Sequence, residues 1–197
     1  MKKAILIIVC VLLADQLSKI YIKTHFLYGE EYLVFDWFRI HFIENNGMAW
    51  GAEFGGRAGK LFLTLFRLVA LTGIGYWLYS SLVKQAPTLL IVAISLIFAG
   101  ALGNIIDSVF YGLIFDTPAH GLATLFADQP YGSLFFGKVV DMLYFPIWTG
   151  ILPEWLPFWG GKPFTFFNAI FNIADSAISI GVGILIFFNK RVFPTAL

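Results

Sequence analysis

The chain has 197 residues, of which 59% are hydrophobic, 18% are aromatic and only 13% are charged. A soluble domain carries about 25% charged residues, so this composition excludes an ordinary water-soluble fold and indicates a polytopic membrane protein. The net charge of +1 gives no reason to expect a nucleic-acid partner. Cys10 is the single cysteine and excludes an intramolecular disulfide, and with only three scattered histidines the sequence predicts neither a metal site nor a cofactor.

Long apolar runs predict an all-α membrane protein with four transmembrane helices in a single domain, residues 1–197. The expected helices are residues 4–22, 61–82, 88–107 and 167–188. They leave two long outer segments, residues 23–60 and 109–166. The start of the chain resembles a lipoprotein signal peptide, but the bulky Val9 before Cys10 and the lack of a small-residue cleavage pattern favour a first transmembrane helix.

The outer segments are expected to have structure of their own. Alternating apolar residues predict short strands at 32–35 and 38–43, and the turns Asn45-Asn46-Gly47 and Gly55-Gly56 fit a small sheet on the membrane surface. The alternative is a plain connecting loop, although residues 23–60 are far longer than the usual link between helices. The aromatic stretch 148–159 is expected to lie at the lipid headgroups as an interfacial segment.

Short basic segments predict the orientation. Lys2 and Lys3, Lys84, and Lys190 with Arg191 all fall on the same side of a four-span chain. The positive-inside rule then places both termini in the cytoplasm and both outer segments outside.

Polar residues in the apolar runs all fall in the outer half of the membrane when depth is counted at about 1.5 Å per residue. Such residues are costly in hydrocarbon and need a partner or a function. Asp15 and Lys19 are four residues apart, and an internal ion pair explains them as well as a supporting role in a site does. The convergent residues are Asp15, Lys19, Arg67, Asn104, Asp107, Asn172 and Asp175, with Asp141 in the adjacent outer segment.

The fourth apolar run carries a polar stripe in its first half only, which predicts a site at one depth rather than a pore. On a continuous helix, one face would hold Asn168, Asn172, Asp175, Ser176 and Ser179.

Several aspartates, without a paired nucleophile or the usual metal ligands, point to aspartyl hydrolysis of a peptide bond. Two carboxylates held close together share one proton, so one acts as a base on water while the other donates to the substrate carbonyl. Asp141 and Asp175 are the candidate pair, with Asn172 one turn from Asp175. The alternative is a carrier that uses the carboxylates for ions, although the chain shows no internal repeat. A structural assembly protein would not need several intramembrane aspartates.

Five patches together resemble the lipoprotein signal peptidase (signal peptidase II) family over nearly the whole chain. They are Asp15-Gln16-Leu17-Ser18-Lys19, Asn45-Asn46-Gly47-Met48-Ala49-Trp50, Gly100-Ala101-Leu102-Gly103-Asn104-Ile105-Ile106-Asp107, Val139-Val140-Asp141 and Phe171-Asn172-Ile173-Ala174-Asp175. The resemblance implies a bacterial inner-membrane aspartyl endopeptidase that cleaves diacylglyceryl-modified prolipoproteins N-terminal to the modified cysteine. It also implies inhibition by globomycin-type cyclic peptides.

The resemblance implies that Asp141 and Asp175 are the catalytic dyad. Its supporting positions match Asp15, Asn45, Gly47, Asn104, Asp107 and Asn172. Lys19 and Arg67 join this supporting set from their position among the polar residues in the outer half of the membrane.

Two features depart from the family pattern. Ser108 stands where the family usually has arginine, and residues 111–136 form an insertion that is expected to govern substrate affinity. Arg67 is expected to compensate, either by pairing with Asp107 or by holding the backbone carbonyls of the substrate. The alternative is that Arg67 snorkels to the headgroups.

Overall fold

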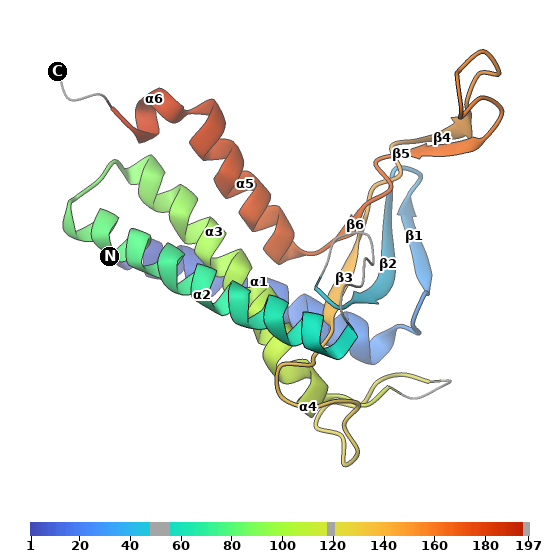
Figure 1. The fold of residues 1–197 in the computed structure, drawn as a ribbon, viewed down its shortest axis with the longest axis horizontal. Helices are drawn as coiled ribbons and strands as arrows, with labels where there is room; N and C mark the ends of the chain where they lie inside the picture. Colours follow the sequence, from blue (N-terminus) through green and yellow to red (C-terminus); the bar gives the residue numbers. More distant parts are fainter. Residues whose placement is uncertain (48–55, 118–120, 195–197) are drawn as a thin grey trace.

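The computed structural model describes residues 1–47, 56–117 and 121–194. Among these residues, three helices are long and apolar enough to cross a membrane. They are α1 (Lys2–His25), α2 (Gly56–Val83) and the helix that begins with α3 (Thr88–Ile106). Each contains almost all of its expected range. Helix α3 lies at the centre of the bundle and packs against α1, α2 and α5 (Figure 1).

The third helix was expected to end near Asp107, but it extends further. It continues through a π-helical segment, η2 (Asp107–Tyr111), and the short α4 (Gly112–Ile114). The segment stays helical because its outer carbonyls find donors: the backbone N–H groups of Gly137, Phe135 and Gly132 donate to Ser108, Val109 and Gly112, respectively. The predicted loop at 109–114 is therefore wrong.

The fourth helix, α5 (Ile173–Phe187), begins six residues later than expected and is followed by α6 (Asn189–Val192). Ile170 and Phe171 instead form a short strand, and Phe167 has a φ of 63° that interrupts any helix there. Asn168 is thus not on the helix; its side chain accepts a hydrogen bond from the Tyr144 hydroxyl at 3.1 Å. With 15 residues, α5 is an apolar helix of less than full spanning length.

The expected surface sheet is present and has two more strands than predicted. The expected strands are β1 (Glu31–Phe35) and β2 (Phe38–Asn45), and they are joined by β3 (Val139–Tyr144) and β6 (Ile170–Phe171). The order is β1-β2-β3-β6, and every neighbouring pair is antiparallel. Asp141 on β3 lies opposite Ile43 on β2. The sheet crosses the ends of α1 and α2 (Figure 1).

Residues 148–159, expected as an interfacial segment, form β4 (Trp148–Ile151) and the start of the loop that joins it to β5 (Pro163–Phe166) in a two-stranded hairpin. The hairpin extends sideways beyond the sheet, on the side away from α4 (Figure 1). It lies between β3 and β6 in the chain and so connects the two strands closest to the candidate aspartates.

A hydrophobic cluster joins the C-terminal end of α1, the sheet and the beginning of the insertion. Its buried members are Ile22, Phe42, Tyr111, Phe115, Val140 and Met142. Tyr111 and Phe115 belong to the predicted loop insertion, but they are core residues. This part of the insertion is therefore structural support for β3. Met48–Trp50 of the second sequence patch, Gly55 and residues 118–120 of the insertion lie outside the described residues.

Candidate active site

The N-terminus of α5 is built around Asn172 and Asp175. Asn172 is the N-cap, and its side-chain oxygen accepts the backbone N–H of Asp175 at 2.9 Å. The Asp175 carboxylate in turn lies 3.4 Å from the backbone N–H of Asn172, which completes a capping box. Asparagine is among the preferred N-cap residues because its short side chain satisfies an otherwise unpaired helical N–H. The motif fixes Asp175 at the first turn of the helix.

The Asn172 side chain also contacts the second aspartate. Its amide nitrogen donates to Asp141 Oδ1 at 2.7 Å and lies 3.2 Å from the Val140 carbonyl oxygen. The same nitrogen lies 3.1 Å from Asn104 Oδ1, and the Asn104 amide donates to Asp175 Oδ1 at 2.8 Å. The two asparagines therefore bridge the two aspartates, which come from a strand and from a helix 34 residues further along the chain.

Asp141 is only 4% exposed and is held from both sides by amides. Asn45, at the end of β2, donates to its second carboxylate oxygen. Burial, and then the neighbouring charge of Asp175, raise the pKa of Asp141 to about 7. A carboxyl group in such a setting exchanges a proton near neutral pH, which suits acid–base chemistry.

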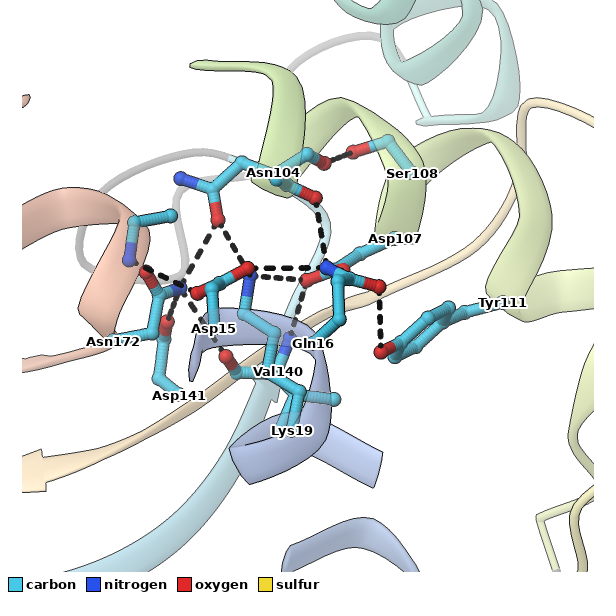
Figure 2. Close-up of polar contacts among 12 residues, drawn as sticks. Asp15, Gln16, Lys19, Asn104, Asp107, Ser108, Tyr111, Val140, Asp141 and Asn172 are labelled. Atoms are coloured by element: carbon cyan, nitrogen blue, oxygen red, sulfur yellow. Dashed lines mark hydrogen bonds and ion pairs between the residues drawn. The ribbon is translucent and has the colours of Figure 1, made fainter. Parts of the chain in front are cut away.

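A fully buried ion cluster lies beside these residues (Figure 2). The Lys19 ammonium is 2.9 Å from Asp15 and 2.7 Å from Asp107, and all three side chains are 0% exposed. Lys19 also donates to Asn104 Oδ1 at 2.9 Å. Both explanations of Asp15 and Lys19 thus hold together: they form an ion pair, and that pair supports the asparagine that binds Asp175.

Asp15 also contacts the N-terminus of α5 directly. Its Oδ1 atom accepts the backbone N–H of Ala174 at 2.9 Å, where the helix dipole favours a negative charge. Glycines on α3 make this approach possible. A Cβ atom at Gly103 would lie 2.6 Å from Asp15 Oδ2, and one at Gly100 would lie 2.2 Å from the Ala174 carbonyl oxygen. The close approach of α1 and α5 to α3 therefore requires glycine at both positions.

Gln16 and Tyr111 complete the cluster, and the sequence analysis did not include either in the site. The Gln16 amide donates to Asp15 at 3.0 Å and to Asp107 at 2.9 Å, while its oxygen accepts the Tyr111 hydroxyl at 3.2 Å (Figure 2). Gln16 could have been predicted from the sequence, because it is a polar residue beside Asp15 in an apolar run. Tyr111 offered none, since it becomes part of the core only through long-range packing.

Arg67 on α2 does not pair with Asp107, which was one of its two expected partners. Lys19, not Arg67, is the cation paired with Asp107. The Arg67 guanidinium instead donates to the Gly47 carbonyl and lies close enough to Asp175 for an electrostatic interaction. Gly47 has a φ of 92°, and a Cβ atom there would lie 2.6 Å from Arg67 Nη1, so this approach requires glycine.

The turn at Gly47 connects Arg67 to the other aspartate as well. The Gly47 N–H donates to Asn45 Oδ1 at 2.6 Å, and Asn45 donates to Asp141. Arg67 therefore contacts one side of a chain of hydrogen bonds that ends at the Asp141 carboxylate. Its half-buried position facing this turn does not fit a side chain that snorkels away from the site.

Ser108 occupies a closed position next to Asp107. Its hydroxyl donates to the Asn104 carbonyl at 2.9 Å, its side chain is buried, and its own carbonyl accepts the N–H of Gly137. Because Ser108 is buried, a longer side chain at this position would have to displace the residues around it. A Cβ atom at Gly137 would lie 2.0 Å from the Asp107 carbonyl oxygen, which shows how tightly the insertion is docked.

The assembled site contains two aspartates linked by two asparagines, with a buried ammonium behind them. Within residues 1–47, 56–117 and 121–194, no three His, Cys, Asp or Glu side chains are grouped so that they could hold a metal ion. The arrangement can share one proton between Asp141 and Asp175, which is the requirement for activating a water against a carbonyl. Eight of the ten predicted site residues lie on the elements that meet here, while Gly47 lies in the turn after β2 and Asn172 is the N-cap of α5.

Comparisons with known proteins identify the family of this chain. The model of the family described as signal peptidase (SPase) II matches residues 7–190. A lipoprotein signal peptidase of Porphyromonas gingivalis is 48% identical over 187 residues, covering 94% of this chain and 81% of the relative. One of Amoebophilus asiaticus is 36% identical over 185 residues, covering 90% and 72%.

A solved structure of similar fold is described as a bacterial membrane enzyme determined by the in meso method at 1.9 Å resolution. It is 29% identical, with a TM-score of 0.64 over 96% of this chain and 93% of that one. The family model and the two relatives above are named as signal peptidases, which decides against the ion-carrier alternative. The chain belongs to the signal peptidase II family of aspartic proteases, a multi-pass membrane enzyme that removes signal peptides from prolipoproteins.

Proposed function

We propose that Asp141 and Asp175 are the catalytic dyad of this peptidase. The observation that carries the proposal is the position of Asn172, which caps α5, binds Asp175 through the capping box and donates to Asp141 at 2.7 Å. A single residue thereby sets the relative position of two carboxyl groups from different elements. Asn104 on α3 supports this arrangement, because its amide donates to Asp175 and its oxygen accepts the Asn172 amide.

We assign the shared proton to Asp141 in the resting enzyme, because burial raises its pKa to about 7. Asp175, near Arg67, then takes a proton from the attacking water as the water oxygen bonds to the scissile carbonyl carbon. Asp141 donates its proton to the carbonyl oxygen, which stabilises the tetrahedral intermediate. When the C–N bond breaks, the proton on Asp175 moves to the leaving amine, and the intermediate's hydroxyl returns its proton to Asp141.

The ion cluster has a positioning role in this mechanism. Lys19 fixes Asn104 and neutralises Asp15 and Asp107, while Asp15 holds the N-terminus of α5. Arg67 and Gly47 fix Asn45 from the opposite side. These contacts keep both carboxyl groups in place before substrate arrives, which is how an aspartyl site avoids reorganisation during the reaction.

The orientation that we propose has four spans, with α5 and α6 as the fourth, and both termini in the cytoplasm of a bacterial inner membrane. Its support is a depth count. Asp15 lies about 18 Å along α1 from Lys3, and Ala174 lies about 21 Å along the fourth helix from Phe188. Asp15 and Ala174 are hydrogen-bonded to each other, so they lie at the same depth. Both distances, counted from the cytoplasmic ends of the two helices, place that depth in the outer half of the membrane. The sheet and the insertion are then extracytoplasmic.

The finer substrate assignment follows from the resemblance to the family. The substrate cysteine carries diacylglyceryl, the lipid keeps it in the outer leaflet, and cleavage occurs on its N-terminal side. Globomycin-type cyclic peptides are then expected to compete for the dyad. The whole chain, residues 1–197, forms one membrane domain without a cofactor.

Cleavage of a purified lipidated prolipoprotein tests the assignment. Asp141→Asn and Asp175→Asn should each abolish cleavage, because one amide removes either the base or the shared proton. Asparagine has nearly the same shape as aspartate, so the thermal unfolding temperature of each variant in detergent should stay close to that of the wild type. As a matched control, Asp128→Asn, an exposed aspartate in the insertion, should cleave normally. Near-normal turnover by either dyad variant would refute the assignment.

A further inference from the structure

The β4–β5 hairpin carries three strongly exposed aromatic residues. At its tip, Trp155 is 78% exposed, Phe158 is 91% exposed and Trp159 is 64% exposed. Phe158 has a φ of 68°, a left-handed conformation that bulky residues seldom adopt. A two-stranded hairpin is marginally stable alone in water, and exposed apolar patches of this kind mark an interaction surface.

A row of aromatic contacts fixes the base of this hairpin to the sheet. Ring centroids lie 6.0 Å apart for Phe167 and Phe171, 5.6 Å for Phe171 and Phe145, and 4.8 Å for Phe145 and Phe38. Trp37 continues the row at 6.1 Å from Phe145. The hairpin is therefore held by the sheet at one end, and its depth follows from the depth of the site.

The length of α5 places the base of the hairpin at the membrane surface. From Phe188 to Asn172 the helix rises about 24 Å, whereas the hydrocarbon core is about 30 Å thick. About 6 Å of hydrocarbon therefore remains between Asn172 and the outer headgroups. Two residues in extended conformation, at about 3.3 Å each, span this distance. Phe167 and the start of the hairpin then lie at the headgroup boundary. The hairpin extends sideways from this point rather than along the helices (Figure 1).

We propose that the β4–β5 hairpin is a membrane anchor whose tip residues Trp155, Phe158 and Trp159 insert between the headgroups and acyl chains of the outer leaflet. Lipid is the partner that the proposed orientation supplies at this depth, and α5, which follows the hairpin in the chain, also exposes apolar residues such as Ile180. Aromatic side chains are favoured in this interfacial layer. The inference rests on the proposed orientation of the peptidase.

The anchor has a direct consequence for the site, because the hairpin is the covalent link between β3, which carries Asp141, and β6, which leads to Asp175. An anchored hairpin holds this half of the sheet at the level where a lipid-modified cysteine enters. We therefore expect the anchor to act on capture of membrane-bound substrate more than on the chemical step.

Site-directed spin labelling in nanodiscs of phosphatidylethanolamine and phosphatidylglycerol tests the lipid contact. In a Cys10→Ala background, Phe158→Cys or Trp159→Cys is labelled and compared with Ile180→Cys on α5 and Asp128→Cys in the insertion. The tip labels should be accessible to oxygen and shielded from a water-soluble nickel complex, as at position 180, whereas position 128 should show the reverse.

Two results would overturn the anchor. Tip labels that are as accessible to the nickel complex as position 128 would place the hairpin in water. Tip labels shielded from both reagents would show a protein partner, such as a second copy, instead of lipid. The kcat for prolipoprotein cleavage by the same labelled proteins separates this failure from a failure of the peptidase assignment, since the chemical step depends on the dyad and not on the tip.

A kinetic comparison tests the consequence. The triple variant Trp155→Ser, Phe158→Ser, Trp159→Ser should raise KM for vesicle-bound prolipoprotein by at least about fivefold and leave kcat within about twofold. Phe126→Ser removes an exposed aromatic residue from the insertion and should change neither value. Unchanged KM in the triple variant, or an equal rise in the Phe126 control, would refute the proposed role.

Discussion

Replacing Lys19 by methionine tests the ion cluster, because methionine keeps most of the side-chain length and removes only the charge. In the folded enzyme, Lys19 lies within 2.9 Å of Asp15 and 2.7 Å of Asp107, and all three side chains are fully buried. Removing one partner of a buried ion pair leaves an uncompensated charge and costs about 3–5 kcal/mol. Here two carboxylates lose their cation together, so we expect a loss at the upper end of that range.

The free energy of unfolding, measured by denaturant titration in mixed micelles, gives this value directly. The double variant Lys19→Met, Asp107→Asn should recover about half of the loss, because only Asp15 stays charged and it keeps the Ala174 N–H. The single variant should also lower kcat by about 10- to 100-fold, since Asn104 loses a donor and no longer fixes Asp175. A Lys19→Met enzyme with wild-type stability would refute the cluster as a stabilising feature.

Three further results are expected. Burial raises the pKa of Asp141 from 3.8 to about 7, so its proton stabilises the folded state fully below about pH 4, and this stabilisation is lost as the pH rises to about 7. The value of kcat should fall as the pH rises through about 7, because Asp141 then loses the proton that it donates. A flat kcat profile from about pH 6 to 9 would show that Asp141 is not the proton donor. Gly137→Ala should destabilise the enzyme by about 1–3 kcal/mol in thermal unfolding, because its Cβ would lie 2.0 Å from the Asp107 carbonyl oxygen, whereas Gly132→Ala meets only ordinary contacts and should be neutral. Arg67→Lys should reduce kcat about tenfold in the cleavage assay, because an ammonium does not reproduce the planar guanidinium contact with the Gly47 carbonyl, and full activity would remove Arg67 from the site.

The insertion is the feature whose expected role changes most. An outer loop that governs affinity would leave the site intact when trimmed. Instead, Tyr111 and Phe115 are core residues, and Gly137 and Phe135 donate to the carbonyls that follow Asp107. Trimming the insertion is therefore expected to lower stability and kcat together. The burial of Ser108 is consistent with a small residue at this position.

The sequence alone determined the membrane class, the location of the long helices and the set of polar residues in the site. These properties are local: an apolar run of spanning length indicates a helix, and a charge within such a run needs a partner. Asp15, Lys19, Asn104 and Asp107 could be grouped because depth along a helix follows from residue number. The first two strands of the small sheet could also be predicted, because the alternation of apolar and polar residues within β1 and β2 does not depend on distant residues.

Only the tertiary structure decided which partner each polar residue takes. Lys19 pairs with Asp107 from 88 residues away, and Asn172 becomes an N-cap because the residues just before it pair with β3 as a strand. Apolar periodicity cannot distinguish a buried strand from the start of a helix, so the fourth helix was placed six residues too early. Pairing and capping are settled by contacts between segments distant in the chain, where burial makes an unpaired charge or N–H too costly to leave.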